Sequence, residues 1–220
     1  MLSEKPFAVD AGEAREVAEA ARRHGVRVAE AFHDLHHPVT TRLHALLASG
    51  EPGELRSAEA DLAIPAPPDG DPRWSVALAG GALMDIGCYG LHALRHLGPW
   101  ASGAPALESA SGRPRAGRGG VDEAMTAHLR FPAGATGVVR CDMATALDFV
   151  RPDRDDRIRV EHLGRRPSYS YQPEAFAAHV REDAPLRTGP ADAVATMVLI
   201  DEVHRAAGSP PRQRTTAATG

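Results

Sequence analysis

Lysine is the residue that this sequence most clearly lacks. Lys5 is the only lysine among the 25 lysine and arginine residues of the 220-residue chain. Arginine keeps its proton in proteins, whereas a lysine ammonium can shift its pKa and take part in proton transfer. Lys5 is therefore either a surface residue without a special role or a candidate for chemistry that arginine cannot perform.

Other shortages exclude whole classes of protein. A net charge of -4 and a pI near 6.3 give no basic surface for nucleic acid. No apolar run approaches the ~20 residues of a membrane span, and residues 1–6 lack the apolar core of a signal peptide. The only cysteines, Cys88 and Cys141, have neither zinc-ligand spacing nor the pattern of a disulfide framework. The sequence therefore predicts a cytoplasmic protein that binds neither nucleic acid nor a membrane.

The first 31 residues have the pattern of a strand, a helix and a strand. Asp10 and Glu13 have the spacing of a capping box, a helix is predicted over residues 11–24, and Gly25 ends it. The stretch Val26-Arg27-Val28-Ala29-Glu30-Ala31 predicts a short strand. Residues 1–31 thus look like the tail of a parallel βαβ unit. A parallel sheet needs more strands, so this unit either extends another sheet or follows a half that is missing.

Residues 32–208 alternate between strands in the middle and helices around them, which is typical of an α+β fold. Residues 209–220 read as a disordered tail. The predicted helices cover residues 38–50, 82–97, 173–183 and 190–207, and the predicted strands cover 53–64, 122–131, 135–144 and 157–162. Pro132-Ala133-Gly134 joins the strands over 122–131 and 135–144 and predicts a hairpin. A polar loop is predicted over 113–120.

The predicted helix over 82–97 carries the densest group of reactive side chains. Asp85, Tyr89, His92 and His96 recur at i, i+4, i+7 and i+11, so a regular helix would place them on one face. A carboxylate, a phenol and an imidazole together can hold a hydroxylated substrate and move a proton. The same spacing also fits an exposed polar face, or a helix whose His92 makes one hydrogen bond in the core.

Several motifs in the right order resemble one oxidoreductase family. The sequence is similar to the glucose-fructose oxidoreductase, inositol dehydrogenase and rhizopine-catabolism (Gfo/Idh/MocA) family over nearly its whole length. The motifs that carry the resemblance are Glu4-Lys5-Pro6, Ala29-Glu30-Ala31-Phe32 followed by His37-Pro38, Asp71-Pro72-Arg73-Trp74, and Gly81-Ala82-Leu83-Met84-Asp85-Ile86-Gly87-Cys88-Tyr89.

The resemblance implies a two-domain architecture and a set of catalytic residues. In that family a Rossmann domain binds NAD or NADP, and an α+β domain with an open, mostly antiparallel sheet carries the substrate and often the dimer contact. By position, Lys5 would lie beside nicotinamide and substrate, Asp85 would bind substrate hydroxyls, and Tyr89 would exchange a proton. A nearby lysine ammonium is expected to lower the pKa of the Tyr89 phenol. A homodimer through the open sheet is expected.

Further site residues follow from the same comparison of motifs. We expect His92, His33, His37 and Trp74 to contact the substrate. Glu4 and Pro6 would touch the cofactor only if NAD(P) binds.

The histidine-rich stretch before Pro38 does not predict a metal site. His33, Asp34, His36 and His37 lie within five residues, but the adjacent His36 and His37 point apart in any regular structure. We predict no metal, and a rearranged substrate pocket instead.

The sequence departs from the family at the phosphate-binding motif. No Gly-x-Gly-x-x-Gly follows a strand and opens a helix, and Gly117-Arg118-Gly119-Gly120 does not qualify because a loop precedes it. The family pattern places that motif before Glu4. The expectation is therefore that the Rossmann half is missing and that the chain binds NAD(P) weakly or not at all.

Three functions remain open on the sequence alone. The first is non-redox acid/base chemistry, such as enolisation, epimerisation, elimination or cyclisation, on a sugar-like or carbonyl-bearing small molecule. The second is NAD(P)-dependent oxidation by a dehydrogenase whose Rossmann half is supplied by another chain or lost. The third is a non-catalytic partner subunit, against which the retained Lys5, Asp85 and Tyr89 weigh.

Overall fold

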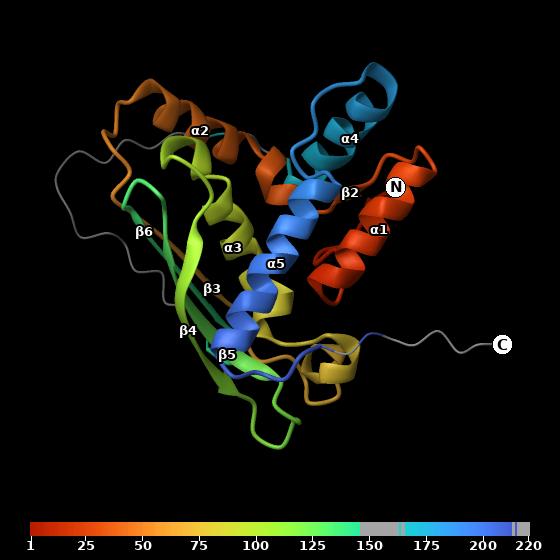
Figure 1. Ribbon diagram of the computed structural model, residues 1–220, viewed down its shortest axis with the longest axis vertical. Helices are drawn as coiled ribbons and strands as arrows, with labels where there is room; N and C mark the ends of the chain where they lie inside the picture. The colour runs from red at the N-terminus through yellow and green to blue at the C-terminus, as the bar shows by residue number, and fades with distance from the viewer. Residues whose placement is uncertain (146–162, 164–165, 213, 215–220) are drawn as a thin grey trace.

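A four-stranded sheet forms one side of the molecule (Figure 1). The computed structural model describes residues 1–145, 163, 166–212 and 214. The strands are β3 (Ser57–Ala63), β4 (Ala106–Pro114), β5 (Asp122–Arg130) and β6 (Thr136–Asp142), in the order β3-β6-β5-β4. β3 and β6 are parallel, and the other two pairings are antiparallel. The predicted α+β fold with a mostly antiparallel sheet is confirmed, as is the predicted hairpin of β5 and β6.

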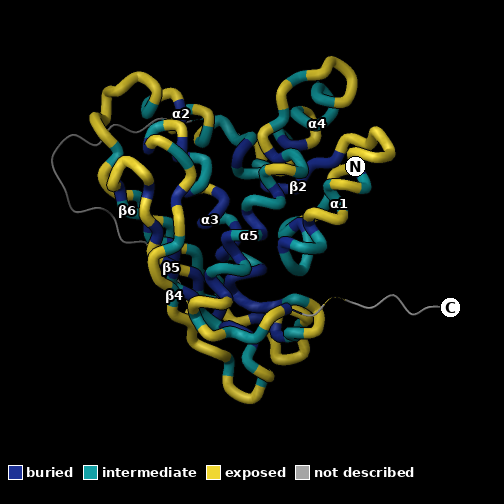
Figure 2. The backbone as a smooth tube through the Cα atoms, in the orientation of Figure 1, coloured by how far each residue is buried: buried dark blue, intermediate teal, exposed yellow. Residues whose placement is uncertain are grey.

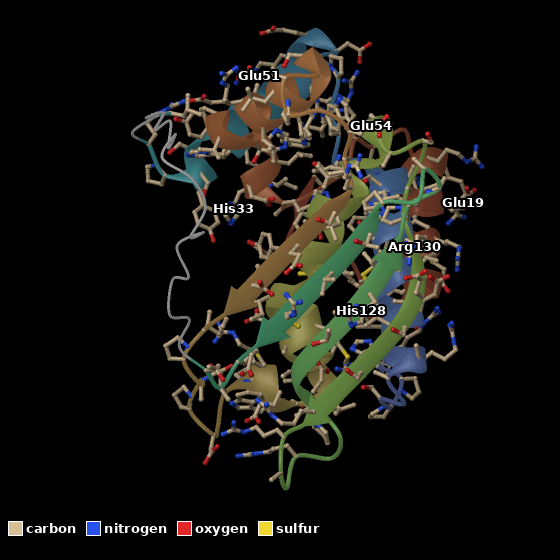
Figure 3. The ribbon with its side chains drawn as sticks, turned by 90° about the vertical axis from the view of Figure 1, so that its left-hand side faces the viewer. Glu19, His33, Glu51, Glu54, His128 and Arg130 are labelled. Carbon is tan, nitrogen blue, oxygen red and sulfur yellow. The ribbon has the colours of Figure 1, made fainter. Side chains whose placement is uncertain are left out.

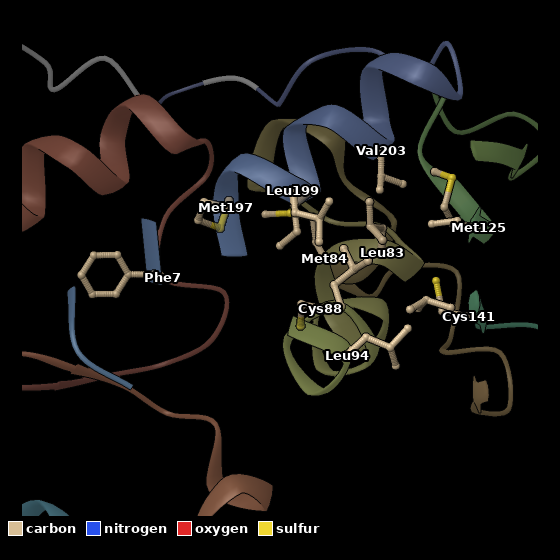
Figure 4. Close-up of a cluster of buried hydrophobic side chains, with 14 of the residues drawn as sticks. Phe7, Leu83, Met84, Cys88, Leu94, Met125, Cys141, Met197, Leu199 and Val203 are labelled. Carbon is tan, nitrogen blue, oxygen red and sulfur yellow. The ribbon is translucent and has the colours of Figure 1, made fainter. Parts of the chain in front are cut away.

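Two helices, α3 (Cys88–Arg95) and α5 (Pro190–Ala206), lie against one face of the sheet. Their apolar side chains and those of the preceding turn meet the inward-facing residues of β5 and β6 in a shared core, which runs through the centre of the molecule (Figures 2 and 4). Helices α2 (Pro38–Ser49) and α4 (Tyr171–Glu182) lie near the top of the molecule in the view of Figure 1. The buried core residues labelled in Figure 4 include Leu83, Met84, Leu94, Met125, Cys141 and Val203.

The N-terminal segment forms the predicted strand, helix and strand. β1 (Leu2–Ser3) pairs in parallel with β2 (Ala29–Glu30), and α1 (Ala11–Arg23) connects them and lies beside α5. Asp10 accepts the Glu13 N–H at 2.8 Å, and the Glu13 carboxylate accepts the Val9 N–H at 2.8 Å. β2 is shorter than the predicted strand over 26–31, because β1 offers only two residues to pair with. The assignment of residues 1–31 to a separate domain stays a prediction.

The sequence analysis did not predict β4, and one strand that it did predict cannot be compared with the structure. β4 has a Ser/Gly-rich sequence without β-branched residues, which is why no strand was predicted there. Part of the predicted 113–120 loop therefore belongs to β4. The predicted strand over 157–162 lies outside the described residues.

The assignment of residues 209–220 to a disordered tail stays a prediction, but two arginines of this segment contact the folded part of the chain. The Arg212 side chain is 1% exposed and pairs with the buried Asp122. Arg214 reaches α1, with its Nε 2.8 Å from Asp10 Oδ2 and its Nη1 2.7 Å from Glu16 Oε1. These partners lie far away in the sequence, so composition alone does not reveal them.

By length and composition alone, the stretch Val76–Trp100 could cross a membrane. The sequence analysis expected no such stretch. Within this fold, 56% of its most apolar window is buried. A helix in the core of a globular protein is buried in the same way, so the stretch is weak evidence for a membrane span.

The opposite face of the sheet carries polar side chains (Figure 3). Arg140 of β6 pairs with Glu59 at 2.8 Å and Asp61 at 3.0 Å on β3, and Arg130 pairs with Glu108 at 2.8 Å. No described helix covers this face in the view of Figure 3. The homodimer through the sheet stays a prediction, to be checked by the mass of the chain in solution.

Gly90 lets α3 approach the sheet closely. A Cβ at this position would lie 2.6 Å from Val139 Cγ1 and 3.0 Å from Leu62 Cδ1. Gly90→Val should therefore lower the free energy of unfolding by about 1–3 kcal/mol through overpacking. Ala93→Val, on the exposed side of the same helix, should cost only ~0.5–0.7 kcal/mol of helix propensity. Urea denaturation of both variants checks the difference, and equal losses would contradict the close approach.

Candidate active site

Lys5 and Asp85 meet where the N-terminal segment approaches the helix that precedes α3. The Lys5 ammonium donates a hydrogen bond to the Asp85 backbone carbonyl, and its Nζ lies 3.3 Å from Asp85 Oδ1. Arg73 Nε lies 2.9 Å from the other oxygen, Asp85 Oδ2. The side chains of Lys5 and Asp85 keep 15% and 22% of their surface exposed. The structure thus brings together two of the predicted catalytic residues and leaves them accessible.

A buried carboxylate fixes the start of the helical turn that presents Asp85. Asp85 lies in a π-helical turn, Leu83–Gly87, and Asp122 Oδ2 accepts the Leu83 N–H at 2.7 Å. Gly81 has φ of +123°, and a side chain there would collide with Asp122 and Arg212. Burial alone would raise the pKa of Asp122, but the nearby His204, with its Nε2 3.6 Å away, and the charge of Arg212 outweigh it and lower the pKa. π-helical turns are rare and frequent at functional sites.

Tyr89 completes the site one turn further along. Lys5 Nζ lies 5.0 Å from the centre of the Tyr89 ring, over its face. The ring is half-buried, and this burial raises the pKa of the phenol well above its ordinary value. The predicted lowering of this pKa is therefore wrong. The ammonium faces the ring, and the loss of solvent around the phenol dominates.

The residues predicted to share one polar face of the helix point in different directions. Asp85 and Tyr89 face Lys5, whereas His92 is completely buried and lies 3.1 Å from Asp192 Oδ2 through its Nε2. The His92 ring stacks on Phe32 at 3.8 Å, and Phe32 in turn makes an edge contact with Tyr89 at 5.3 Å. The imidazole of His92 thus faces the core and Asp192, and its predicted contact with the substrate stays a prediction.

Asp192 joins α5 to α3 through a buried group of polar side chains. Arg95 Nη1 donates to Asp192 Oδ1 at 2.9 Å and to Thr196 Oγ1 at 2.7 Å. Burial would raise the pKa of Asp192, but the His92 hydrogen bond and the charge of Arg95 outweigh it and hold the pKa below its ordinary range. Burial also lowers the pKa of His92.

Glu30 is the residue near this site that the sequence analysis missed. It is completely buried at the end of β2, and its Oε1 accepts the Phe7 N–H at 2.8 Å, two residues after Lys5. Its Oε2 is buried with no partner among the described residues. Burial raises the pKa of Glu30 to about 8. A glutamate at the end of an apolar strand pattern was the available signal.

Glu30 should make the chain less stable as the pH rises. Its pKa of about 8 in the fold exceeds the ordinary 4.5, so the folded chain keeps a proton that the unfolded chain releases. The contribution of Glu30 to the free energy of unfolding is therefore fully present below about pH 4.5. It is lost as the pH rises through about 8, by at most about 5 kcal/mol. In Glu30→Gln this fall should largely disappear. Urea denaturation across this range measures the slope, and an unchanged slope in the variant would assign it to other groups.

The other predicted substrate contacts, His33, His37 and Trp74, lie in different surroundings. His33 lies beside the site, with its ring 5.5 Å from Tyr89 and 3.9 Å from Tyr169. His37 instead caps α2, since its Nδ1 accepts the Val39 N–H at 3.2 Å. Trp74 is 3% exposed, and its indole donates to the Pro67 carbonyl at 3.0 Å. Trp74 therefore packs in the core, and its predicted substrate contact stays a prediction.

The N-terminus of α1 does not fit the phosphates of a dinucleotide. Free N–H groups at a helix N-terminus favour a pyrophosphate. At α1 two carboxylates occupy these groups, because Asp10 accepts the Glu13 N–H and Asp201 accepts the Ala11 N–H at 2.9 Å. Glu4 is exposed and Pro6 partly buried, next to Lys5, and their contact with NAD(P) stays a prediction.

Known sequences of two kinds match the chain. A dTDP-3,4-didehydro-2,6-dideoxy-alpha-D-glucose 3-reductase of Actinomadura kijaniata is 40% identical over 93 residues, 42% of this chain and 28% of that protein. A trans-1,2-dihydrobenzene-1,2-diol dehydrogenase of Mus musculus is 33% identical over 152 residues, 67% of this chain and 43% of that protein. The matched regions are thus less than half of either relative's length.

A solved structure matches nearly the whole chain. The 3-ketoreductase from Actinomadura kijaniata in complex with NADP and TDP-benzene is 28% identical, with a TM-score of 0.80, over 93% of this chain and 70% of that one. Further structures of that enzyme carry a replacement of one tyrosine by phenylalanine or of one lysine by alanine. Those two residues are separated by the same number of positions as Lys5 and Tyr89 are here.

A family model covers the middle of the chain. The model of the GFO/IDH/MocA C-terminal domain matches residues 40–164, more than half of the sequence. This match includes β3, α3 and the β5–β6 hairpin. The chain therefore belongs to the GFO/IDH/MocA family, whose members matched above are oxidoreductases.

Proposed function

We propose that the chain binds a sugar-like small molecule with a hydroxyl or carbonyl group at Lys5, Asp85 and Tyr89 and transfers a proton to or from its oxygen. The observation that carries the proposal is the convergence of Lys5 on both Asp85 and Tyr89, from segments far apart in the sequence. The lysine and tyrosine replaced in the 3-ketoreductase have the same separation, which supports the assignment.

Tyr89 is the proton donor in this proposal. Its raised pKa keeps the phenol protonated at neutral pH. A protonated phenol can give its proton to an oxygen that gains negative charge, as a carbonyl oxygen does when it becomes an alkoxide. The direction of the shift therefore favours protonation of a carbonyl over removal of a proton from an alcohol.

Lys5 and Asp85 position the substrate oxygen. The Lys5 ammonium supplies positive charge beside Tyr89, and that charge stabilises an oxyanion. Asp85 holds Lys5 on one carboxylate oxygen and Arg73 on the other, so its orientation is fixed from both sides. Its partly exposed carboxylate can accept a hydrogen bond from a substrate hydroxyl.

The relatives favour a reduction or oxidation as the overall reaction. Those that match are named as reductases and a dehydrogenase, and the structural relative holds NADP. NADP supplies a hydride when it is bound. The proton transfer by Tyr89 is common to that reaction and to the non-redox reactions expected from the sequence, and we propose weak or no NAD(P) binding by these 220 residues alone.

The test is a reaction of the chain with a panel of keto-sugars in D₂O, with and without NADPH. Absorbance follows NADPH consumption, and NMR follows deuterium exchange at the carbon beside the carbonyl. Exchange without NADPH indicates the non-redox reaction, and NADPH consumption indicates the reduction. The proposal fails if neither occurs while NMR shows no sugar bound, or if the activity survives in Lys5→Ala.

A further inference from the structure

A second group of potential ligand atoms lies behind the proposed active site. His92 Nε2, His96 Nε2 and a carboxylate oxygen of Asp192 all lie within 4.8 Å of one another. His92 Nε2 is 3.1 Å from Asp192 Oδ2, and His96 Nε2 is 3.3 Å from Asp192 Oδ1. His92 lies on α3, His96 follows four residues later as the residue that caps the end of this helix, and the aspartate comes from the first turn of α5.

Several buried polar atoms around this group have no hydrogen-bond partner among the described residues. His96 Nε2 is one of them, because its approach to Asp192 lacks hydrogen-bond geometry. His36 Nε2 and Asp34 Oδ1 are also buried and unpartnered. Buried polar atoms normally have partners, so unpartnered imidazole nitrogens and a carboxylate oxygen in one region indicate a bound ion or water.

We propose that His92, His96 and Asp192 bind one divalent transition-metal ion of the zinc class. Two imidazoles and a carboxylate are ligands that suit zinc, whereas magnesium and calcium prefer oxygen ligands throughout. Histidines at i and i+4 on one helix present their nitrogens to the same point, as in known zinc sites. The metal holds α3 against α5.

Arg95 is compatible with this site as an outer partner of the carboxylate. Its Nη1 donates to Asp192 Oδ1, the backbone carbonyl of Asp192 and Thr196. Asp192 Oδ2 is the oxygen nearer to His92 and is left for the metal. Ligating carboxylates commonly accept such a second hydrogen bond, which fixes their orientation.

A cavity adjoins one of the three proposed ligands, His96. A space of about 340 Å³ between α2, β3 and α3 is bordered by Asp34 and His96. An ion can enter there and keep a water on the open side.

The test is a titration of the chain, without a histidine tag and freed of metal with EDTA, with Zn²⁺ by calorimetry and with Co²⁺ by visible absorption. One ion per chain should bind, and the d–d bands of Co²⁺ should report nitrogen and oxygen ligands. His96→Gln should weaken Zn²⁺ binding by at least about 100-fold. The melting temperature should rise with Zn²⁺ in the wild type and not in His96→Gln.

Two control variants test whether Zn²⁺ binding depends on His92 and His96 rather than on other histidines. His44→Gln removes a buried histidine that bonds Arg187 at 2.8 Å, and His37→Gln removes one from the histidine-rich stretch. Both should bind Zn²⁺ as the wild type does. The proposal is overturned if no saturable binding occurs, or if His92→Gln and His96→Gln, once shown to be folded by circular dichroism, keep wild-type affinity.

Discussion

Asp122→Asn should lower the free energy of unfolding by about 3–5 kcal/mol. The carboxylate is 1% exposed, accepts the Leu83 N–H and pairs with the equally buried Arg212. An asparagine removes the negative charge and leaves the guanidinium uncompensated in a place without solvent. Removing one member of a buried pair is costly for this reason, even where the pair itself adds little. Urea denaturation measures the loss.

Asp61→Asn provides the matched control for this prediction. Asp61 also pairs with an arginine, at 3.0 Å, but 46% of its side chain is exposed on the open sheet. Its replacement should cost no more than ~1 kcal/mol. Asp122→Asn combined with Arg212→Met should recover part of the loss, because no unpaired charge remains buried. A loss in Asp122→Asn as small as in the control would mean that Arg212 does not depend on this carboxylate.

Tyr89→Phe should reduce turnover of a substrate found in the keto-sugar panel by at least about 100-fold, because general acid catalysis contributes 10²–10⁴-fold. The variant keeps the ring that contacts Phe32 and Lys5 and removes only the hydroxyl. Substrate binding and the urea midpoint should therefore change little. Steady-state rates, read together with the midpoint, separate loss of the proton donor from loss of the fold.

Tyr169→Phe is the control for the hydroxyl. Tyr169 is 65% exposed and contacts His33 beside the site, so its phenol is close to Tyr89 without a proposed chemical role. It should keep the wild-type rate. If Tyr89→Phe also keeps that rate, the proton comes from another group and the proposed mechanism is wrong.

The local patterns predicted most of the helices and the central hairpin. Capping residues at α1, the glycine after α2 and the turn between β5 and β6 are signals that act within a few residues, and the structure follows them. The convergence of Lys5 with Asp85 and Tyr89 followed from the resemblance to a family. No periodicity places residues 80 positions apart within 3.3 Å.

The surroundings that the sequence patterns did not reveal depend on long-range partners. His92 satisfies the helical spacing that suggested a substrate contact, yet Asp192, 100 residues later, draws it into the core. Trp74 has an exposed-looking context of proline and arginine, but its indole donates to Pro67 and Arg115 lies over its ring at 4.1 Å. The pKa of Tyr89 depends on how much solvent reaches the phenol, and a one-dimensional pattern carries no measure of burial.

The pairing of Asp122 with Arg212 also sets an order of events during synthesis. Arg212 leaves the ribosome after 90 further residues have followed Asp122, which takes several seconds at about 5–20 residues per second. Until then the carboxylate that holds Leu83 lacks its buried counter-charge. A nascent chain can therefore form the β5–β6 hairpin early, while the turn that presents Asp85 acquires its final geometry only when translation has passed Arg212.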